Sequence, residues 1–189
     1  MSGAGPPTDF QLIQRYRRGD PRAMEELVER YQQKLFGYVF NATRHRQETE
    51  EIYQDTWLRV VKNMARYHDQ CFSAWLFRIA RNLIIDRRRG RRELASLDRD
   101  NAGGGTLRDA LPDAAPAPDA RAAEQDLRSR LDAAVRQLPD DQREVFQLRM
   151  DGGLSFKEIA AVQGVSINTA LARMQYALVK LRGAVKLDD

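Results

Sequence analysis

The chain has 189 residues, of which 42% are hydrophobic and 31% charged, and 31 lysines and arginines against 27 acidic residues give a net charge of +4. This length allows one domain or two small ones, and the composition is typical of a soluble, charge-rich helical protein. The single cysteine, Cys71, excludes an intramolecular disulfide and favours a reducing compartment. No apolar run approaches the roughly 18 residues of a membrane span, and residues 1–9 lack a secretory pattern, so we expect a cytoplasmic protein without membrane insertion.

The N-terminal part of the chain is predicted to begin with two helices. A short helix is expected from Thr8 to Arg18. Asp20-Pro21 then starts a second helix, with the aspartate as N-cap and the proline at the first helical position. Apolar residues at helical spacing continue this helix to near Asn41, and they are Met24, Leu27, Val28, Tyr31 and Leu35.

A third helix is predicted from about Gln47 to Arg66. Its apolar stripe consists of Tyr53, Trp57, Val60, Val61 and Met64. A second face is polar and partly acidic around one apolar residue, and it consists of Glu51, Gln54, Asp55, Leu58 and Lys62. On its own, this second pattern is typical of an ordinary solvated helix face.

A fourth helix is predicted from about Ser73 to Arg92, and its last seven residues contain five arginines and one aspartate. The run continues a polar stripe made of Arg78, Arg81, Asn82, Arg88 and Arg89. Aromatic residues lie close to it in the sequence, namely Tyr67, Phe72, Trp75 and Phe77. Arginines interleaved with aromatic rings suit unstacked single-stranded bases, so the face as a whole indicates nucleic-acid binding. Taken one at a time, Phe72, Trp75 and Phe77 are expected to belong mostly to the core.

Residues 95–120 differ in composition from the rest of the chain. They contain seven alanines, three prolines, a Gly103-Gly104-Gly105 run and no aromatic residue, and their charged groups sum to −3. So few large apolar groups cannot offset the entropy of ordering, which predicts a flexible acidic linker. A functional loop and simple filler are the alternatives.

The C-terminal part is also predicted to be helical. Leu127, Leu131, Val135 and Leu138 are spaced for one helix that stops at Pro139. Asp140 or Asp141 caps the next helix, which carries Val145, Phe146 and Leu148 and ends before Gly152-Gly153.

Two further helices form a helix-turn-helix candidate from Leu154 to about Leu181. Ser155 and Glu158 form a capping box, Gly164 suits a left-handed turn, and Ser166 caps a last helix reaching about Val185. Its helices are expected to pack through Ile159, Ala160, Val165 and Leu178. The first turn of the last helix would enter the major groove, where the groups able to reach DNA are Ser166, Asn168, Thr169 and Arg173. A plain helical hairpin is the alternative.

Segments at both ends of the chain resemble bacterial sigma factors of the extracytoplasmic-function (ECF) group. The N-terminal similarity, to regions 2.2 to 2.4, lies in Glu51 to Asp55 with Leu58, in Phe72 to Asn82 and in Asp86 to Arg88. The C-terminal similarity, to regions 4.1 and 4.2, lies in Leu138-Pro139, Gln142 to Phe146, Leu148-Arg149, Leu154-Ser155, Glu158 to Ala160, Gly164 to Ser166, Thr169 and Arg173. The resemblance implies an all-α fold with sigma region 2 at residues 8–94 and sigma region 4 at residues 121–187, joined by the linker 95–120.

The resemblance also implies roles for single residues. The residues implied to dock on the clamp coiled coil of the largest polymerase subunit are Glu51, Gln54, Asp55 and Leu58. Recognition and opening of the minus-ten promoter element falls to Tyr67, His68, Trp75, Arg78, Asn82, Asp86, Arg87 and Arg88. The loop from Tyr67 to Gln70 would hold a flipped base. Reading of the minus-thirty-five element as duplex falls to Ser166, Asn168, Thr169 and Arg173.

The implied partners are core RNA polymerase, promoter DNA and an anti-sigma factor, with no small-molecule substrate, cofactor or metal. The chain would not be an enzyme, because the polymerase performs the chemistry. A DNA-binding regulator with a sensory N-terminal half is one alternative, although a sensor does not need a basic and aromatic stripe. An enzyme is another, but His68 and Cys71 supply only half a metal site, and His45 is the one other histidine. Cys71, next to Phe72, is expected to be a buried thiol.

Overall fold

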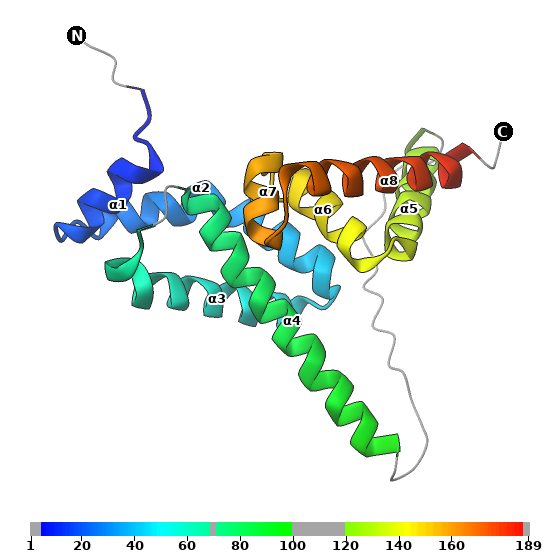
Figure 1. Cartoon of the computed structure of the whole chain (residues 1–189), viewed down its shortest axis with the longest axis horizontal. Coiled ribbons are helices and arrows are strands. Elements are labelled where there is room, and N and C mark those ends of the chain that lie inside the picture. Colours follow the sequence, from blue (N-terminus) through cyan, green and yellow to red (C-terminus); the bar gives the residue numbers. More distant parts are fainter. Residues whose placement is uncertain (1–4, 69–70, 100–119, 187–189) are drawn as a thin grey trace.

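A computed structural model describes residues 5–68, 71–99 and 120–186, and within these residues the fold is all-α, with eight α-helices, one 3-10 helix and no strand (Figure 1). This confirms the predicted fold class. Most of the proposed linker and its Gly103-Gly104-Gly105 run lie outside the described residues, as do Asp69 and Gln70 of the predicted base-holding loop. No helix in the described part of the chain is long and apolar enough to cross a membrane.

The N-terminal unit consists of α1 (Asp9–Arg17), α2 (Arg22–Thr43), α3 (Arg46–Asn63), the 3-10 helix η1 (Met64–Arg66) and α4 (Phe72–Arg99). Helix α2 begins one residue later than predicted, with Pro21 at the N-cap position. Asp20 nevertheless caps it, since its Oδ1 accepts a hydrogen bond from the Arg22 amide at 3.1 Å. Helix α4 continues past the predicted end at Arg92, and its C-terminal half projects away from the other helices (Figure 1).

The C-terminal unit consists of α5 (Ala120–Gln137), α6 (Asp140–Met150), α7 (Phe156–Gln163) and α8 (Ile167–Lys186). The capping box of Ser155 and Glu158 is confirmed, and Gly164 adopts the left-handed conformation at φ 69°. Ser166 caps α8 as predicted, because its Oγ accepts from the Thr169 amide at 3.0 Å. Helices α7 and α8 with this turn form the predicted helix-turn-helix.

The inward stripe of α8 differs by one position from the prediction. Leu178 is 37% exposed, whereas the buried residues are Ala170, Met174, Ala177 and Leu181. These four follow the spacing i, i+4, i+7 and i+11, so Leu178 lies beside the buried stripe and not within it. Val61, Leu127 and Leu131 were likewise placed on apolar stripes but are exposed.

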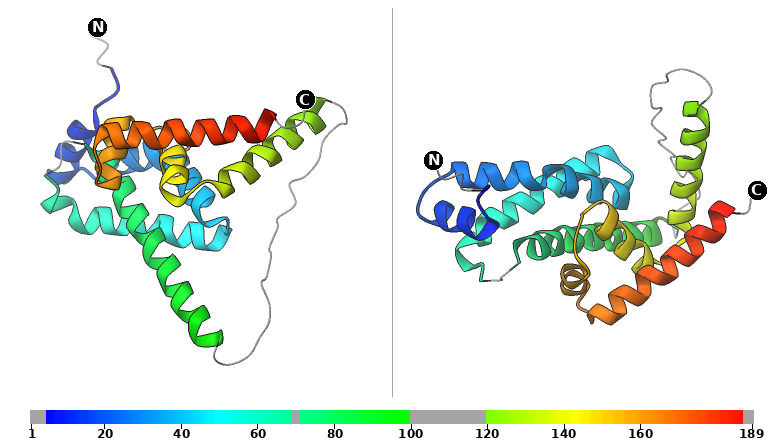
Figure 2. Two further views of the ribbon diagram at one scale, coloured as in Figure 1. Left: turned by 45° about the vertical axis from the view of Figure 1, so that its right-hand side comes forward. Right: turned by 90° about the horizontal axis from the view of Figure 1, so that it is seen from above.

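The two units share one hydrophobic core. Helix α7 lies against α4, as the two views of Figure 2 show, and α6 contacts α2. Phe77 of α4 is fully buried in the same cluster as Leu148, Leu154 and Ile159 of the C-terminal unit. A second, smaller cluster joins α5 to α8 through Val135, Leu138, Ala177 and Leu181. Most of the buried apolar residues of the C-terminal unit therefore lie in the same core as α4, while the cluster between α5 and α8 is separate.

Gly152 allows the units to approach each other closely. A Cβ atom at this position would lie 2.9 Å from a ring carbon of Phe77, 2.9 Å from Leu154 Cδ1 and 2.7 Å from the Leu148 carbonyl oxygen. Such distances are shorter than ordinary van der Waals contact, so any side chain there would push the two units apart.

We expect Gly152→Ala to lower the free energy of unfolding by about 1–3 kcal/mol, the typical cost of overpacking a core. Urea denaturation of the full chain measures this value. Gly183→Ala is the matched control, because Gly183 lies within α8 with open space around it. There the same change should be stabilising by about 0.5–1 kcal/mol through helix propensity. Equal stability of Gly152→Ala and the parent chain would contradict the close contact.

Candidate nucleic-acid interface

Helix α4 presents a cavity beside the 3-10 helix η1. The cavity has a volume of about 430 Å³ and brings together four of the predicted minus-ten residues, Tyr67, His68, Trp75 and Asn82. The rings of Tyr67 and Trp75 lie 4.6 Å apart between centroids. His68 and Asn82 are exposed, whereas Tyr67 is buried and Trp75 is half-buried. Rings on the wall and a side-chain amide at the rim form a site into which a flat, polar group can enter.

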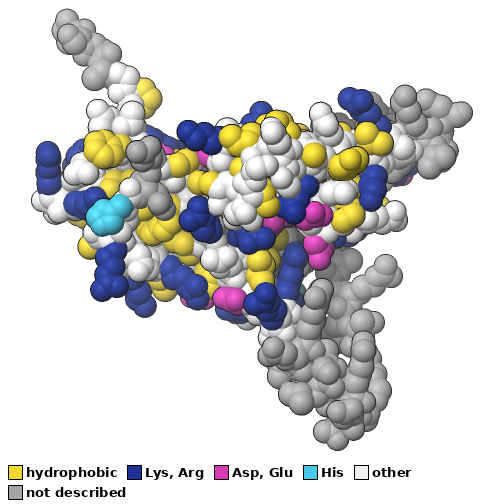
Figure 3. Space-filling view, in the orientation of Figure 1, with side chains coloured by type: hydrophobic (Ala, Val, Ile, Leu, Met, Phe, Trp, Pro, Cys, Tyr) yellow, Lys and Arg dark blue, Asp and Glu magenta, His cyan; other side chains and the backbone are white. Residues whose placement is uncertain are grey.

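Three polar residues that the sequence analysis did not single out complete the cavity wall. They are Arg59, Asn63 and Arg66. Their spacing of i, i+4 and i+7 puts them on the same side of the chain at the end of α3 and in η1, opposite α4. The spacing alone predicts that Arg59, Asn63 and Arg66 lie on one side of the chain. Only the fold shows that this side lies opposite Trp75. Figure 3, which has the orientation of Figure 1, shows lysines and arginines spread over the face of the molecule that is in view.

The other predicted minus-ten arginines do not point into the cavity. Arg78 donates from Nη2 to the carbonyl oxygen of Ala161 in α7 at 2.9 Å. Arg88 donates to the carbonyl oxygen of Ala42 near the end of α2 at 2.8 Å. Asp86 is exposed. The stripe predicted on α4 is therefore divided between the cavity and contacts with neighbouring helices.

Arg87 lies against the predicted docking helix. Its guanidinium is 2.6 Å from Glu51 Oε2 and 3.7 Å from Asp55 Oδ2. The hydrogen bond from Arg87 is the main reason that the pKa of Glu51 lies below its usual value. On the same helix Leu58 is 55% exposed, and Gln54 is also exposed. The four predicted docking residues thus share one accessible face, and Arg87 belongs to this face by its contacts.

An apolar groove of about 550 Å³ adjoins the predicted docking face, which consists of Glu51, Gln54, Asp55 and Leu58. It runs between α2 and α3 and includes Phe36, Gly37, Tyr53 and Gln54 in its lining. The rings of Phe36 and Tyr53 lie edge to face, with 6.0 Å between their centroids. The docking face therefore continues into an apolar surface able to accept the side chains of a partner.

The predicted duplex-reading residues occupy the start of α8 but do not all point outward. Ser166, Asn168 and Thr169 are exposed, and the hydroxyl oxygens of Ser166 and Thr169 lie 2.8 Å apart. Arg173, one turn further on, contacts Asp141 Oδ2 at 3.0 Å and donates to Gln163 Oε1 at 2.8 Å. Its guanidinium is directed toward α6 and α7.

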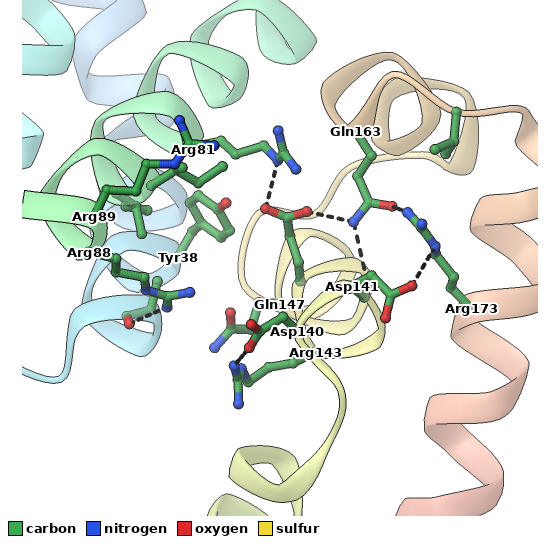
Figure 4. A pocket seen from close by; sticks show the side chains of 15 residues that line it. Tyr38, Arg81, Arg88, Arg89, Asp140, Asp141, Arg143, Gln147, Gln163 and Arg173 are labelled. Atoms are coloured by element: carbon green, nitrogen blue, oxygen red, sulfur yellow. Dashed lines mark hydrogen bonds and ion pairs between the residues drawn. The ribbon is translucent and has the colours of Figure 1, made fainter. Parts of the chain in front are cut away.

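A cleft of about 510 Å³ separates α4 from α6 and α8, and Figure 4 shows its lining. Arginines reach it from both units, namely Arg81, Arg88, Arg89, Arg143 and Arg173. Glu144 stands between them, with Oε1 at 2.7 Å from Arg81 Nε and Oε2 at 2.6 Å from Gln163 Nε2. The network Arg81–Glu144–Gln163–Arg173 therefore connects the two units without a break.

Glu158 forms a second polar contact between the units. Its Oε1 accepts hydrogen bonds from the Ser73 hydroxyl and, at 3.3 Å, from the Cys71 thiol, while Oε2 accepts from the Ser155 amide at 2.6 Å. Burial alone would raise the pKa of Glu158, but the hydrogen bonds from Ser155 and Ser73 outweigh it and lower the pKa. Cys71 is half-buried, and among the described residues no three metal-ligating side chains converge on it or elsewhere.

Because the pKa of Glu158 is lower in the folded chain, its charge stabilises the fold at neutral pH. That contribution is lost as the pH falls below the usual value of 4.5. Glu158→Gln should therefore weaken the fold by about 1 kcal/mol at neutral pH, allowing for solvent screening, and should flatten the acid limb of the stability curve. Urea denaturation across the acid range measures both. Glu50→Gln, at an exposed i,i+4 ion pair, is the control, and identical acid limbs for Glu158→Gln and the parent would contradict the contact.

Comparisons with known proteins match both units. A model of Sigma-70 region 2 matches residues 27–93, and a model of Sigma-70 region 4 matches residues 128–181. The RNA polymerase sigma factor CarQ of Myxococcus xanthus is 31% identical over 171 residues, covering 90% of this chain and 93% of CarQ. The ECF RNA polymerase sigma factor SigE of Mycolicibacterium smegmatis is also 31% identical, and the match covers 87% of this chain but 63% of SigE.

Two solved structures are similar in fold. CnrH, in complex with the cytosolic domain of CnrY, is 25% identical with a TM-score of 0.69, covering 96% of this chain and 99% of CnrH. The sigma factor RpoE of Bartonella quintana, in complex with the anti-sigma factor NepR, is 22% identical with a TM-score of 0.67. This second match covers 89% of this chain and 99% of RpoE, and it shows similarity of fold alone.

Proposed function

Because this chain belongs to the ECF group of RNA polymerase sigma factors, we propose that it binds core polymerase and directs the start of transcription at specific promoters. The observation that carries this proposal is one chain holding both a cavity of about 430 Å³ lined by two aromatic rings and a capped helix-turn-helix. The first suits an unpaired strand and the second suits a duplex, and promoter opening needs both. The chain itself makes or breaks no covalent bond, because the polymerase performs the chemistry.

The cavity beside α4 is the proposed site for a base flipped out of the minus-ten element. Unstacking a base costs a few kcal/mol, which the pocket must offset by stacking and hydrogen bonds. Tyr67 and Trp75 supply rings, Asn82 supplies an amide, and Arg59 and Arg66 lie on the wall where phosphates of the flanking strand would pass. Arg78, Arg87 and Arg88 would reach this strand only after leaving their present contacts.

The start of α8 is the proposed reader of the minus-thirty-five element. Ser166, Asn168 and Thr169 are exposed on its first turn, where a helix that enters the major groove contacts base edges and phosphates. The N-terminal end of the helix also favours phosphate through its dipole. In this reading residues 121–187 form the duplex-binding domain, residues 8–94 form the strand-opening domain, and residues 95–120 connect them.

The α3 face is the proposed contact with core polymerase. Glu51, Gln54 and Asp55 offer polar groups around the exposed Leu58, and the neighbouring groove adds apolar surface. The same surfaces suit an anti-sigma factor, since a partner that covers them would exclude the polymerase. The CnrH similarity supports a protein partner, because that protein was solved with the cytosolic domain of CnrY. We place the chain in the cytoplasm, where polymerase and chromosome are found.

Replacing Asp55 and Leu58 together with arginine should reduce binding to core polymerase at least about tenfold, because it reverses a charge and removes the central apolar contact of the face. Pull-down with purified core enzyme measures the loss. The matched control changes Glu29 and Phe10 to arginine, which alters one exposed acid and one exposed apolar residue elsewhere. Equal binding by both double variants would remove the α3 face from the interface.

His68→Ala and Asn82→Ala should each weaken binding of the polymerase complex to an opened promoter strand by roughly fivefold or more, the usual effect of losing one contact to a base. Fluorescence anisotropy with labelled single-stranded promoter DNA measures this affinity. Tyr176→Ala is the control, because Tyr176 is an exposed ring on α8. If all three variants bind alike, the cavity does not hold a base.

Run-off transcription with core polymerase on a set of promoter fragments tests the proposed function as a whole. A promoter-specificity subunit should give transcripts with a defined start, and only when the chain is present. A DNA-binding transcription regulator, the alternative function, would not compete with another sigma factor for binding to core polymerase. Failure to produce any defined start would reject the function proposed here.

A further inference from the structure

Arg17, the last residue of α1, reaches the turn that leads into the cavity beside α4. Its Nε and Nη2 donate to the Met64 carbonyl oxygen at 3.2 and 2.8 Å, and Nη2 also donates to the Tyr67 carbonyl oxygen. Met64 is the first residue of η1, and Tyr67 is the residue that follows its end. One guanidinium therefore holds both ends of the turn that brings Tyr67 and His68 to the cavity.

These contacts of Arg17 fix a backbone conformation and do not neutralise a charge. Among the described residues its guanidinium contacts carbonyl oxygens and no carboxylate. Carbonyl oxygens at the end of a helix lack an intrahelical donor, and a planar guanidinium can serve two of them at once. The bond that closes the turn itself, from the Tyr67 amide to the Met64 carbonyl oxygen, is long at 3.3 Å. Arg17 therefore supplies the shorter contacts that hold this turn.

Helix α1 is packed firmly enough to support Arg17. Leu12 and Ile13 are buried in the core, and Asp9 at the other end of the helix pairs with Arg30 of α2. The helix also lies against η1 (Figure 1). The guanidinium thus extends from an element whose position is set by the fold, so it can determine where the two carbonyls lie.

We propose that Arg17 is a positioning residue for the base cavity. The inference rests on the proposed function and gives it a determinant outside the cavity, whose lining among the described residues does not include Arg17. By holding the carbonyls of Met64 and Tyr67, the arginine keeps the Tyr67 ring 4.6 Å from that of Trp75. A base is held well only when the groups around it are themselves held in place. Arg17 therefore acts on the base through Tyr67 and not by contact with DNA.

The test compares opened promoter strands with and without the flipped base, using the full chain bound to core polymerase. Placing an abasic nucleotide at each position of the minus-ten strand in turn identifies the position where affinity falls most. Arg17→Ala should bind the intact strand roughly fivefold more weakly than the parent, because a displaced ring stacks less well on the base. On the strand that is abasic at that position the loss should be less than about twofold, since no base remains to be held. Fluorescence anisotropy at several salt concentrations measures both affinities.

Arg18→Ala is the matched control, because it removes the same charge from the neighbouring exposed arginine. It should bind both strands within about twofold of the parent. Arg17→Lys keeps the charge but replaces the planar fork by a point charge, so it should recover only part of the loss on the intact strand.

Direct contact of Arg17 with a phosphate would give a different result. Arg17→Ala would then weaken binding to both strands equally and lower the slope of log affinity against log salt by about one ion, and Arg17→Lys would bind like the parent. That pattern overturns the proposal, which requires an unchanged salt slope and a loss confined to the strand that carries the base. Should Arg17→Ala lose its helical circular dichroism, Arg17→Lys decides the matter, and parental affinity for both strands rejects the role.

His68→Ala separates this inference from the proposed function. If His68→Ala weakens binding to the intact strand and folded Arg17→Ala does not, the positioning role alone is rejected. If neither variant weakens binding and no abasic position matters, the cavity does not hold a base, and the proposed function of the cavity is rejected with it.

Discussion

The packing of α7 and α6 onto α4 is the contact on which the rest of the structure depends. Phe77 fills the space that Gly152 leaves, and around this pair the two units close into one core. The polar contacts of α4 with the C-terminal unit follow from this approach, because Arg78, Arg81 and Ser73 meet that unit where α4 touches it. The apolar contact supplies the proximity, and the charged groups then determine which side chains are engaged.

Local signals in the sequence predicted most of the fold. Caps and glycines placed the helix-turn-helix correctly, because Ser155, Gly164 and Ser166 act within their own turns. Errors arose where neighbouring helices select the buried side. Leu178 has the right character and nearly the right spacing, but contact with α5, α6 and α7 buries the stripe that contains Ala177 and Leu181. Such a choice depends on helices far away in the sequence.

The sequence predicted only part of the cavity, because its lining comes from more than one helix. The cavity contains Tyr67, His68, Trp75 and Asn82, which the resemblance to sigma factors had implied as one set. Arg59 and Arg66 were missed because only the packing of α3 against α4 places them opposite Trp75. The engagement of Arg78 and Arg173 by carbonyl, carboxylate and amide groups of distant residues has no counterpart in the local pattern.

The pairing of Arg87 with Glu51 has a consequence for the evolution of this chain. The two positions are 36 residues apart, yet one carboxylate and one guanidinium at 2.6 Å make each a part of the other's environment. A substitution on the proposed polymerase-binding face of α3 therefore also alters the surroundings of α4, the helix proposed to contact DNA, and changes at the two sites will not be independent in their effects. Lineages that alter one of these residues are expected to alter the other, so that promoter preference and polymerase compatibility drift together.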